Sequence, residues 1–323
     1  MSSAPAIADY EFDLPSNEEL QTRRRRLFTY SPEALAIGQD IEKIFVKDPA
    51  FADALQAVDR CFQLARTLST PNGILLAGPT GSGKTSLLSY VQQTVPPSSL
   101  FQTGLGTLSI RLPYRPVIGQ VVSTILRRMH YPFADVTSRS VYLKRELAFD
   151  LLREKGVRIV LVDEGHHLES QIRYRDRHGH DTAISELLRE MMDEVGICLV
   201  IVMDGPLDML ERLDPALASR VSVRLSLDNF ARSRVWHAFV KAFFRQTEGK
   251  GIDFSSLAEP TEADRLHAAT DGNRRAFKRL VTEAALVAFD AKKTIIDDEA
   301  LTTAFGRVYG KGHAKLNPYE PAA

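Results

Sequence analysis

The chain has 323 residues, 44% of them hydrophobic and 25% charged, which is typical of an ordinary soluble protein with room for about two domains. Lys and Arg total 41, as do Asp and Glu, so a histone-like polycation is excluded whereas a local basic groove is not. No apolar run approaches the roughly 18–20 residues that cross a bilayer, and the N-terminus shows no secretion signal. We therefore expect a soluble, cytoplasmic protein with no membrane partner. Cys61 and Cys198 each lie in an apolar run, which favours two buried thiols over a disulfide.

The first part of the chain divides into two segments. Residues 1–31 combine acidic residues with a run of arginines, Arg23 to Arg26, and we expect a flexible charged arm. The arginine run suits DNA or an acidic partner, and a solvated arm explains it equally well. Residues 32–69 repeat apolar residues at helical spacing, and Pro49 separates two predicted helices.

Between residues 70 and 228, short apolar runs alternate with helical stretches. The predicted strands are 74–77, 108–112, 158–162, 197–202 and 221–225, and the predicted helices between them are 118–130, 139–155, 181–194 and 207–218. Near-continuous apolar strands that alternate with helices predict an α/β domain with a parallel five-stranded sheet between helices. Residues 229–308 show only helical patterns and predict a small all-helical domain, which residues 309–323 follow as a tail.

A glycine-rich loop stands between the first predicted strand and the helix that follows it. Its residues match the phosphate-binding pattern G-x-x-x-x-G-K-[ST] in full: Gly78, Pro79, Thr80, Gly81, Ser82, Gly83, Lys84 and Thr85, with Ser86 next in the helix. Glycines let backbone N–H groups surround the β-phosphate, and the start of the helix adds the positive end of its dipole. We predict that Lys84 contacts the β- and γ-phosphate oxygens of ATP and that Thr85 holds Mg²⁺.

The third predicted strand runs into two carboxylates, Asp163 and Glu164. A carboxylate at the carboxyl end of a parallel strand, near a phosphate-binding loop, is placed to hold Mg²⁺, and we predict this role for Asp163. Glu164, one residue further on, is placed to polarise the attacking water. The two residues therefore predict hydrolysis of the bound nucleotide.

A histidine pair, His166 and His167, follows these carboxylates. The pair is open to two functional interpretations, a metal site that includes His178 and His180, or part of a helicase-type D-E-x-H element. His178 and His180 lie in a charged loop, which is more typical of a solvated or anion-binding surface than of a metal site. A helicase needs a second RecA-like domain, and the helical pattern of residues 231–308 excludes one.

These features together resemble the AAA+ ATPases: a phosphate-binding loop, Asp-Glu at the third strand, a late arginine and a helical lid. The resemblance implies a catalytic role for Asp204 as the first sensor, at a strand end where Asn, Thr or Ser is usual. It implies that Arg220 is an arginine finger, which reaches the nucleotide of a neighbouring copy. It also implies that Arg274 or Arg275, which follow the glycine of the lid, contacts the nucleotide as the second sensor.

Within the AAA+ ATPases, the layout looks like that of the TniB/TnsC family of DNA transposition regulators. The similar segments are 71–78, 110–116, 126–132, 205–210 and 270–272. The resemblance implies ATP-dependent self-association, as a ring or filament, around double-stranded DNA. It also implies ATP hydrolysis that disassembles the complex, and partners that include a transposase and target-selection proteins.

Two segments carry hydroxyl and basic side chains suited to the phosphate oxygens of DNA. The first segment holds Thr137, Ser138, Arg139, Lys144 and Arg145, and the second, after Asp163, holds Arg173, Arg175 and Arg177. Because the sequence shows no base-reading motif, we expect sequence-independent and salt-sensitive binding to the DNA backbone. The alternative is that both segments are solvated basic surfaces.

Two other functions are compatible with the same motifs. One is a different AAA+ switch, such as a replication helicase loader or initiator, which shares much of this pattern. The other is a nucleotide-binding scaffold without turnover, which the carboxylate of Asp204 at the sensor position favours. Transposase genes next to the gene for this chain would favour the transposition role, and replication genes there would favour the other AAA+ switch. A Glu164→Gln variant that turns over ATP as fast as the wild type would support the scaffold.

Overall fold

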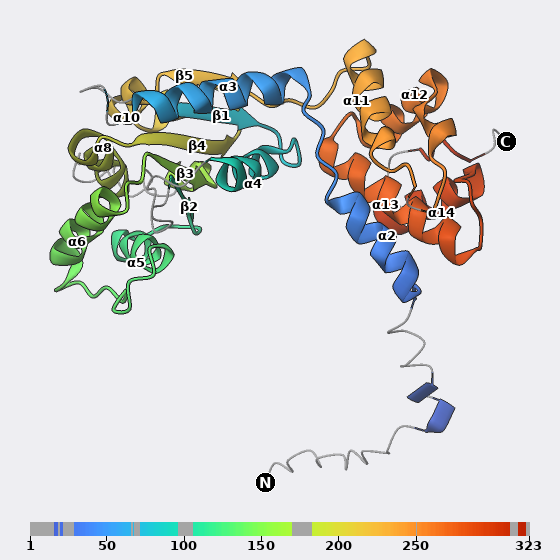
Figure 1. Cartoon of the computed structure of the whole chain (residues 1–323), viewed down its shortest axis with the longest axis horizontal. Coiled ribbons are helices and arrows are strands. Elements are labelled where there is room, and N and C mark those ends of the chain that lie inside the picture. The colour runs from blue at the N-terminus through green and yellow to red at the C-terminus, as the bar shows by residue number, and fades with distance from the viewer. Residues whose placement is uncertain are drawn as a thin grey trace, which may run out of the picture.

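The structure of the chain is a computed structural model, and it describes residues 16–18, 20–21, 29–65, 67, 72–95, 106–169, 183–249, 251–310 and 316–320. Figure 1 shows two bodies next to each other: a sheet covered by helices, and a group of helices formed mainly by the C-terminal part of the chain. The expected α/β core with an added helical domain is therefore confirmed.

Among the described residues, five parallel strands form one sheet in the order β2-β3-β4-β1-β5. They are β1 (Ile74–Gly78), β2 (Thr107–Arg111), β3 (Ile159–Asp163), β4 (Cys198–Asp204) and β5 (Val223–Ser226). The register pairs Gly78 with Asp204 and Arg111 with Asp163. The carboxyl ends of these strands therefore bring together residues that are far apart in the sequence.

Alternate residues of the central strands point to opposite sides of the sheet. Because both sets of side chains are apolar, helices cover both faces. One face is covered by α5 (Ile118–Arg128), α6 (Val141–Glu154) and α8 (Ala183–Val195). The other face is covered by α3 (Pro49–Leu64) and α4 (Lys84–Thr94). Along β3, Val160 belongs to the first of these cores and Leu161 to the second. The near-continuous apolar strands of the sequence are thus buried on both sides, as expected.

The single helix predicted over residues 207–218 is wrong, because the structure has two short helices there, α9 (Met209–Leu213) and α10 (Pro215–Arg220). The break lies at Asp214, whose Oδ1 accepts hydrogen bonds of 2.9 Å from the backbone N–H groups of Ala216 and Leu217. Pro215 has no N–H to continue the preceding helix and fits the first turn of the next one. The second helix then ends at Arg220, shortly before β5.

The helical body has its own core, built by α11 (Arg234–Arg245), α12 (Pro260–Thr270), α13 (Arg274–Asp290) and α14 (Asp298–Tyr309). Aromatic rings fill its centre: the ring centroid of Phe277 lies 5.4 Å from that of Trp236 and 5.0 Å from that of Phe243. Trp236 is fully buried, and its Nε1 donates to the carbonyl oxygen of Ala263 at 2.6 Å. This polar contact orients the largest side chain of the core.

The segment 32–69 contributes to both bodies. Its first helix, α2 (Pro32–Glu42), packs against α13 and places Ile37 and Ile41 in the core of the helical body. Its second helix, α3, packs on the sheet, and Asp48 caps it by accepting backbone hydrogen bonds from Ala50 and Phe51. The connection between the two helices therefore crosses from one body to the other.

The state of the two cysteines agrees with the expectation drawn from composition. Cys61 and Cys198 are unbridged and buried, and Sγ of Cys198 donates to the carbonyl oxygen of Cys61 at 3.2 Å. In the part of the chain that the structure describes, no helix is both long and apolar enough to cross a membrane.

Candidate nucleotide-binding site

The loop between β1 and α4 needs glycine where its backbone turns most sharply. Gly83, which precedes α4, has a φ of +100°, and Gly78 has a φ of +151°. A side chain at Gly78 would place its Cβ 2.1 Å from the carbonyl oxygen of Leu227, which is too close for any residue but glycine. The glycines therefore allow the tight turn into the N-terminus of α4, an end of a helix that favours anions.

Lys84 is the first residue of α4, and its side chain is only 7% exposed. Its Nζ donates to the carbonyl oxygens of Gly78 and Pro79, both at 2.8 Å, and forms an ion pair at 2.8 Å with Oδ1 of Asp204. The protein itself thus supplies three partners for the ammonium group, and one of them, Asp204, is an anion as a phosphate is.

Asp204 ends β4 beside Gly78, and Oγ1 of Thr80 donates to its Oδ2 at 2.5 Å. Burial raises the pKa of the Asp204 carboxyl group, but the hydrogen bonds from Lys84 and Thr80 outweigh this effect and lower the pKa overall. Because the folded-state pKa is lowered, the ion pair of Lys84 with Asp204 stabilises the fold at pH values above the unfolded-state pKa of about 3.9. That contribution is lost only as the pH falls through the lower folded-state value. The predicted first sensor, Asp204, is therefore an anion that contacts Lys84.

Asp163 ends β3, and its Oδ2 accepts a hydrogen bond of 3.3 Å from Oγ1 of Thr85. Its Oδ1 accepts a hydrogen bond of 3.0 Å from the backbone N–H of Glu164. A carboxylate and a hydroxyl oxygen next to a phosphate-binding loop are ligands that Mg²⁺ prefers. The donor set formed by Thr85 and Asp163 therefore fits the magnesium ion that the sequence predicts.

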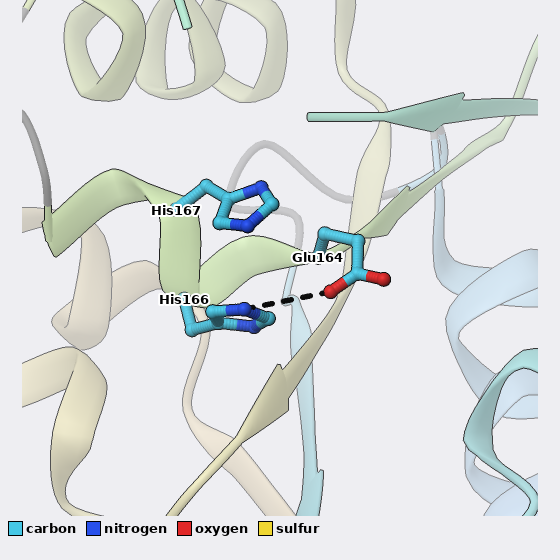
Figure 2. Close-up of side chains that lie close together, drawn as sticks. All are labelled: Glu164, His166 and His167. Atoms are coloured by element: carbon cyan, nitrogen blue, oxygen red, sulfur yellow. Dashed lines mark ion pairs between the residues drawn. The ribbon is translucent and has the colours of Figure 1, made fainter. Parts of the chain in front are cut away.

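Glu164 follows β3 in the left-handed conformation, with a φ of +58°. Its Oε1 pairs with Nη2 of Arg111 at 2.6 Å, and its Oε2 lies 3.5 Å from Nε2 of His166. Figure 2 shows the carboxylate directed toward the His166 ring, with the ring of His167 close by. The Glu164 side chain is 24% exposed, so water reaches it. The carboxylate is therefore held beside the Asp163 site with access to solvent.

The N-terminus of α13 contacts the phosphate-binding loop directly. Nδ2 of Asn273 donates to the carbonyl oxygen of Thr80 at 2.9 Å, and the backbone N–H of Arg275 donates to the carbonyl oxygen of Gly81 at 3.0 Å. The Arg275 side chain is exposed and lines the cavity above the loop. The helical body thus brings this arginine to the cavity above the loop.

Arg274 contacts three separate segments. Its guanidinium pairs with Asp48 at 2.8 Å and donates to the carbonyl oxygens of Ser82 at 3.0 Å and Asp228 at 2.9 Å. The side chains are 11% exposed for Arg274 and 3% for Asp48, so this is a buried ion pair. Arg274 therefore ties the N-terminal segment and the helical body to the loop. Of the two arginines predicted as second sensor, Arg275 is the better placed.

These groups line a cavity of about 890 Å³ between the sheet and the helical body. Its other wall comes from residues 42–46 together with Phe51 and Tyr90, and the rings of Phe45 and Tyr90 stack with centroids 4.7 Å apart. Flat apolar surfaces beside a phosphate-binding loop suit a nucleobase. Arg111 and Arg279 also line the cavity. No pattern in the sequence singles out this wall or these two arginines.

Arg220 lies at the opposite, amino end of the sheet. Its carbonyl oxygen accepts a hydrogen bond of 2.9 Å from Gly73, directly before β1, and its guanidinium pairs with Asp193 of α8 at 2.8 Å. The arginine is therefore remote from Lys84 and Glu164 of its own chain.

The residues predicted to contact DNA differ in how they are held. Three exposed residues lie between α5 and α6: Thr137, Ser138 and Arg139. Nζ of Lys144 donates to the carbonyl oxygen of Phe133 at 2.5 Å. Arg145 forms two hydrogen bonds with Glu190, at 2.9 and 3.1 Å, and its side chain is 20% exposed, so it joins α6 to α8 instead of facing solvent. The remaining candidates lie outside the described residues: Arg173, Arg175, Arg177, His178, His180 and the run Arg23 to Arg26.

Comparisons with known proteins agree with this geometry. The family model described as Bacterial TniB protein matches residues 40–229. A comparison with curated proteins found no significant match. Similar solved structures include the Aeropyrum pernix ORC1 protein in complex with DNA, at 19% identity and a TM-score of 0.59 over 82% of this chain and 66% of that chain. Another is Cdc6p from Pyrobaculum aerophilum, at 18% identity and a TM-score of 0.56 over 84% of this chain and 70% of that one.

The structure of Drosophila ORC bound to DNA matches at 14% identity and a TM-score of 0.55, over 94% of this chain and 70% of that chain. This chain thus spans about two thirds of the length of these structures, 66% of the first. At such identities the likeness shows a shared fold. That fold, an α/β core with a helical domain, agrees with the fold expected from the sequence.

Proposed function

This chain belongs to the bacterial TniB family, and from that premise we propose that it is an ATP-dependent regulator of DNA transposition. The proposed protein binds ATP with Mg²⁺, assembles as a ring or filament on double-stranded DNA, links the target site to a transposase and target-selection proteins, and hydrolyses ATP. The observation that carries this proposal is the meeting of Lys84, Thr85, Asp163 and Glu164 at one end of the sheet, beside a cavity closed by the helical body.

In the proposed binding step, Lys84 exchanges the carboxylate of Asp204 for phosphate oxygens of ATP. Thr85 and Asp163 supply oxygen ligands for Mg²⁺, which neutralises charge on the phosphates when bound. Residues 70–228 form the nucleotide-binding domain and residues 229–308 the lid in this proposal. The backbone hydrogen bond from Arg275 to Gly81 couples the lid to the loop, so the lid responds when nucleotide binds there.

In the proposed hydrolysis step, Glu164 accepts a proton from the water that attacks the γ-phosphorus. The bond from the γ-phosphorus to the bridging oxygen breaks, and ADP and phosphate leave. The ion pair with Arg111 and the contact with His166 hold the Glu164 carboxylate before nucleotide binds. Side chains that position this carboxylate therefore control the rate at which water is activated.

We expect Arg220→Ala to leave ATP affinity unchanged and to lower DNA-stimulated ATP turnover by at least about tenfold. The lost charge-assisted hydrogen bond to a neighbour's γ-phosphate is worth about 1.5–3 kcal/mol, and 1.4 kcal/mol corresponds to tenfold. Steady-state turnover with duplex DNA measures the effect, and Arg212→Ala, which removes an exposed arginine of α9, is the matched control.

Mixing the Arg220→Ala variant with a Lys84→Ala variant tests whether the arginine acts between copies. The first supplies an intact phosphate site and the second an intact Arg220, so mixed assemblies recover part of the turnover. Unchanged turnover in the single Arg220→Ala variant would remove this residue from the proposed role.

We expect Asp204→Asn to tighten ATP binding by about three- to tenfold, because the substitution removes the anion that pairs with Lys84 at 2.8 Å. If Asp204 is also the first sensor, turnover falls in the same variant although affinity rises. Titration with a fluorescent ATP analogue and a turnover assay measure the two effects separately. Asp208→Asn, at a nearby surface position paired with Arg212, changes neither quantity. Weaker ATP binding by Asp204→Asn would contradict the proposed competition for Lys84.

Contact with the DNA backbone is proposed for the exposed segment before α6, where Thr137, Ser138 and Arg139 offer hydroxyl groups and a cation. Lys144 adds a second positive charge nearby. Arg145 is left out of this proposed contact because its guanidinium is taken by Glu190. Binding of this kind weakens as salt rises and does not depend on DNA sequence.

Electron microscopy and light scattering with ATP and duplex DNA test the proposal as a whole. Rings or filaments that require both ATP and DNA are the expected result, and monomers in every nucleotide state would contradict it. An initiator or helicase loader is the second candidate, favoured by the similar ORC and Cdc6 structures, two of which hold DNA. Loading of a replicative helicase in place of recruitment of a transposase would support that alternative.

A further inference from the structure

A cluster of side chains beside the nucleotide site includes two imidazoles, which are not ligands that magnesium prefers. Glu164, His166 and His167 each provide one ligand atom, and these atoms all lie within 4.8 Å of one another. Figure 2 shows the two imidazole rings next to each other, with the carboxylate of Glu164 at their edge. Imidazole nitrogen suits zinc and related transition metals, whereas carboxylate, carbonyl and water oxygens suit Mg²⁺.

The local backbone places the three side chains together. Glu164, in the left-handed conformation, directly precedes the short 3₁₀ helix η1 (Gly165–Leu168), on which both histidines lie. The ring centroids of His166 and His167 are 4.5 Å apart. Nε2 of His166 lies 3.5 Å from Oε2 of Glu164. Two ligands of one tetrahedral zinc ion are about 3.3–3.6 Å apart, so small rotations of the side chains complete the set.

A hydrogen bond orients the His167 ring as a metal ligand. Nδ1 of His167 lies 2.8 Å from the carbonyl oxygen of Leu112, which can only accept, so Nδ1 carries a proton and, in the neutral ring, Nε2 carries the lone pair. A backbone carbonyl that orients the second nitrogen in this way is the usual support of a metal-bound histidine. Nδ1 of His166 is buried and has no hydrogen-bond partner in the part of the chain that the structure describes. Within the described residues, therefore, the His166 ring is not fixed in one tautomer by a hydrogen bond from Nδ1.

We propose that Glu164, His166 and His167 bind one Zn²⁺ or a similar transition-metal ion, with water completing the coordination. The consequence for ATP hydrolysis rests on the function proposed above. A Glu164 carboxylate that coordinates the ion cannot accept the proton of the attacking water. Occupancy of this cluster therefore inhibits turnover even while Thr85 and Asp163 still hold Mg²⁺.

The test uses the full-length protein, with Zn²⁺ titrated calorimetrically in the presence of millimolar Mg²⁺. His167→Asn is the informative variant, because the Asn amide keeps a donor for the Leu112 carbonyl and removes the ligand atom Nε2. His130→Asn removes an exposed histidine outside the cluster. A double variant, His178→Asn with His180→Asn, tests the other histidines near this position in the sequence.

We expect one Zn²⁺ per chain in the wild type, the His130 control and the double variant, and at least about tenfold weaker binding in His167→Asn. In the turnover assay, Zn²⁺ inhibits the wild type, whereas His167→Asn keeps its basal rate and resists inhibition. Equal Zn²⁺ affinity of wild type and His167→Asn, or loss of binding only in the double variant, overturns the proposed site. If Zn²⁺ binds as expected but ATP is not hydrolysed, the metal site stands, while the proposed ATPase function and the inhibition fail together.

Discussion

Lys84→Ala is expected to weaken binding of magnesium-ATP by at least about 100-fold, which brings it below detection in an ordinary titration. The lysine supplies the fixed positive charge of the loop, and one charge-assisted hydrogen bond of about 3 kcal/mol corresponds to roughly that factor. The variant also leaves the Asp204 carboxylate beside the phosphate position without its cation, so repulsion adds to the loss. Isothermal titration with ATP and Mg²⁺ measures the effect.

Two further variants separate lost binding from lost folding. Lys43→Ala removes a lysine at the rim of the same cavity whose side chain is 73% exposed, and it retains wild-type affinity. Lys84→Ala combined with Asp204→Asn removes both members of the ion pair, so it recovers thermal stability but not ATP affinity. Undiminished affinity in Lys84→Ala would exclude the lysine from phosphate binding and with it the proposed ATP site.

Glu164→Gln is expected to bind ATP like the wild type and to lower turnover by about 10²- to 10⁴-fold, the usual contribution of a general base. The amide has the size of the carboxylate and still accepts a hydrogen bond from Arg111, so the fold is preserved. It no longer accepts a proton from water at neutral pH. Phosphate release under saturating ATP and DNA measures the rate, and assemblies on DNA persist longer because hydrolysis no longer ends them.

The control for this prediction is Glu169→Gln, an exposed glutamate just after η1, which keeps the wild-type rate. Turnover of Glu164→Gln equal to that of the wild type would show that this carboxylate does not activate water. That result would favour the nucleotide-binding scaffold, the alternative that the carboxylate of Asp204 suggests. ATP affinity measured in parallel distinguishes this outcome from loss of the site.

The parts of the site that depend on short-range geometry are readable from the sequence. The loop from Gly78 to Thr85 lies between a strand and a helix as predicted, because its glycines are required by the tight turn itself. Asp163 lies next to Thr85, as expected when two parallel strands end at the same edge of a sheet. The break at Asp214 was not expected, although the Asp-Pro pair there is itself a local signal for a new helix.

The partners of these residues depend on strand order and on the packing of the two bodies. Arg111 meets Glu164 only because β2 lies beside β3, and Asp204 reaches Lys84 only because β4 lies beside β1. The apolar wall at Phe45 exists because the chain crosses from the helical body to the sheet at that point. None of these neighbours is close in sequence, so no spacing or periodicity reports them.

The sequence by itself determined the α/β class, the helical domain, the phosphate-binding loop and the acidic strand end, because each follows from local periodicity or from the backbone needs of a few adjacent residues. The tertiary structure decided which charges oppose one another. It paired Arg274 with Asp48 and Arg145 with Glu190, and it placed Arg220 at the end of the sheet away from its own loop. Side-chain partners are set by long-range packing, in which burial requires every charge to find a counter-charge wherever the fold provides one.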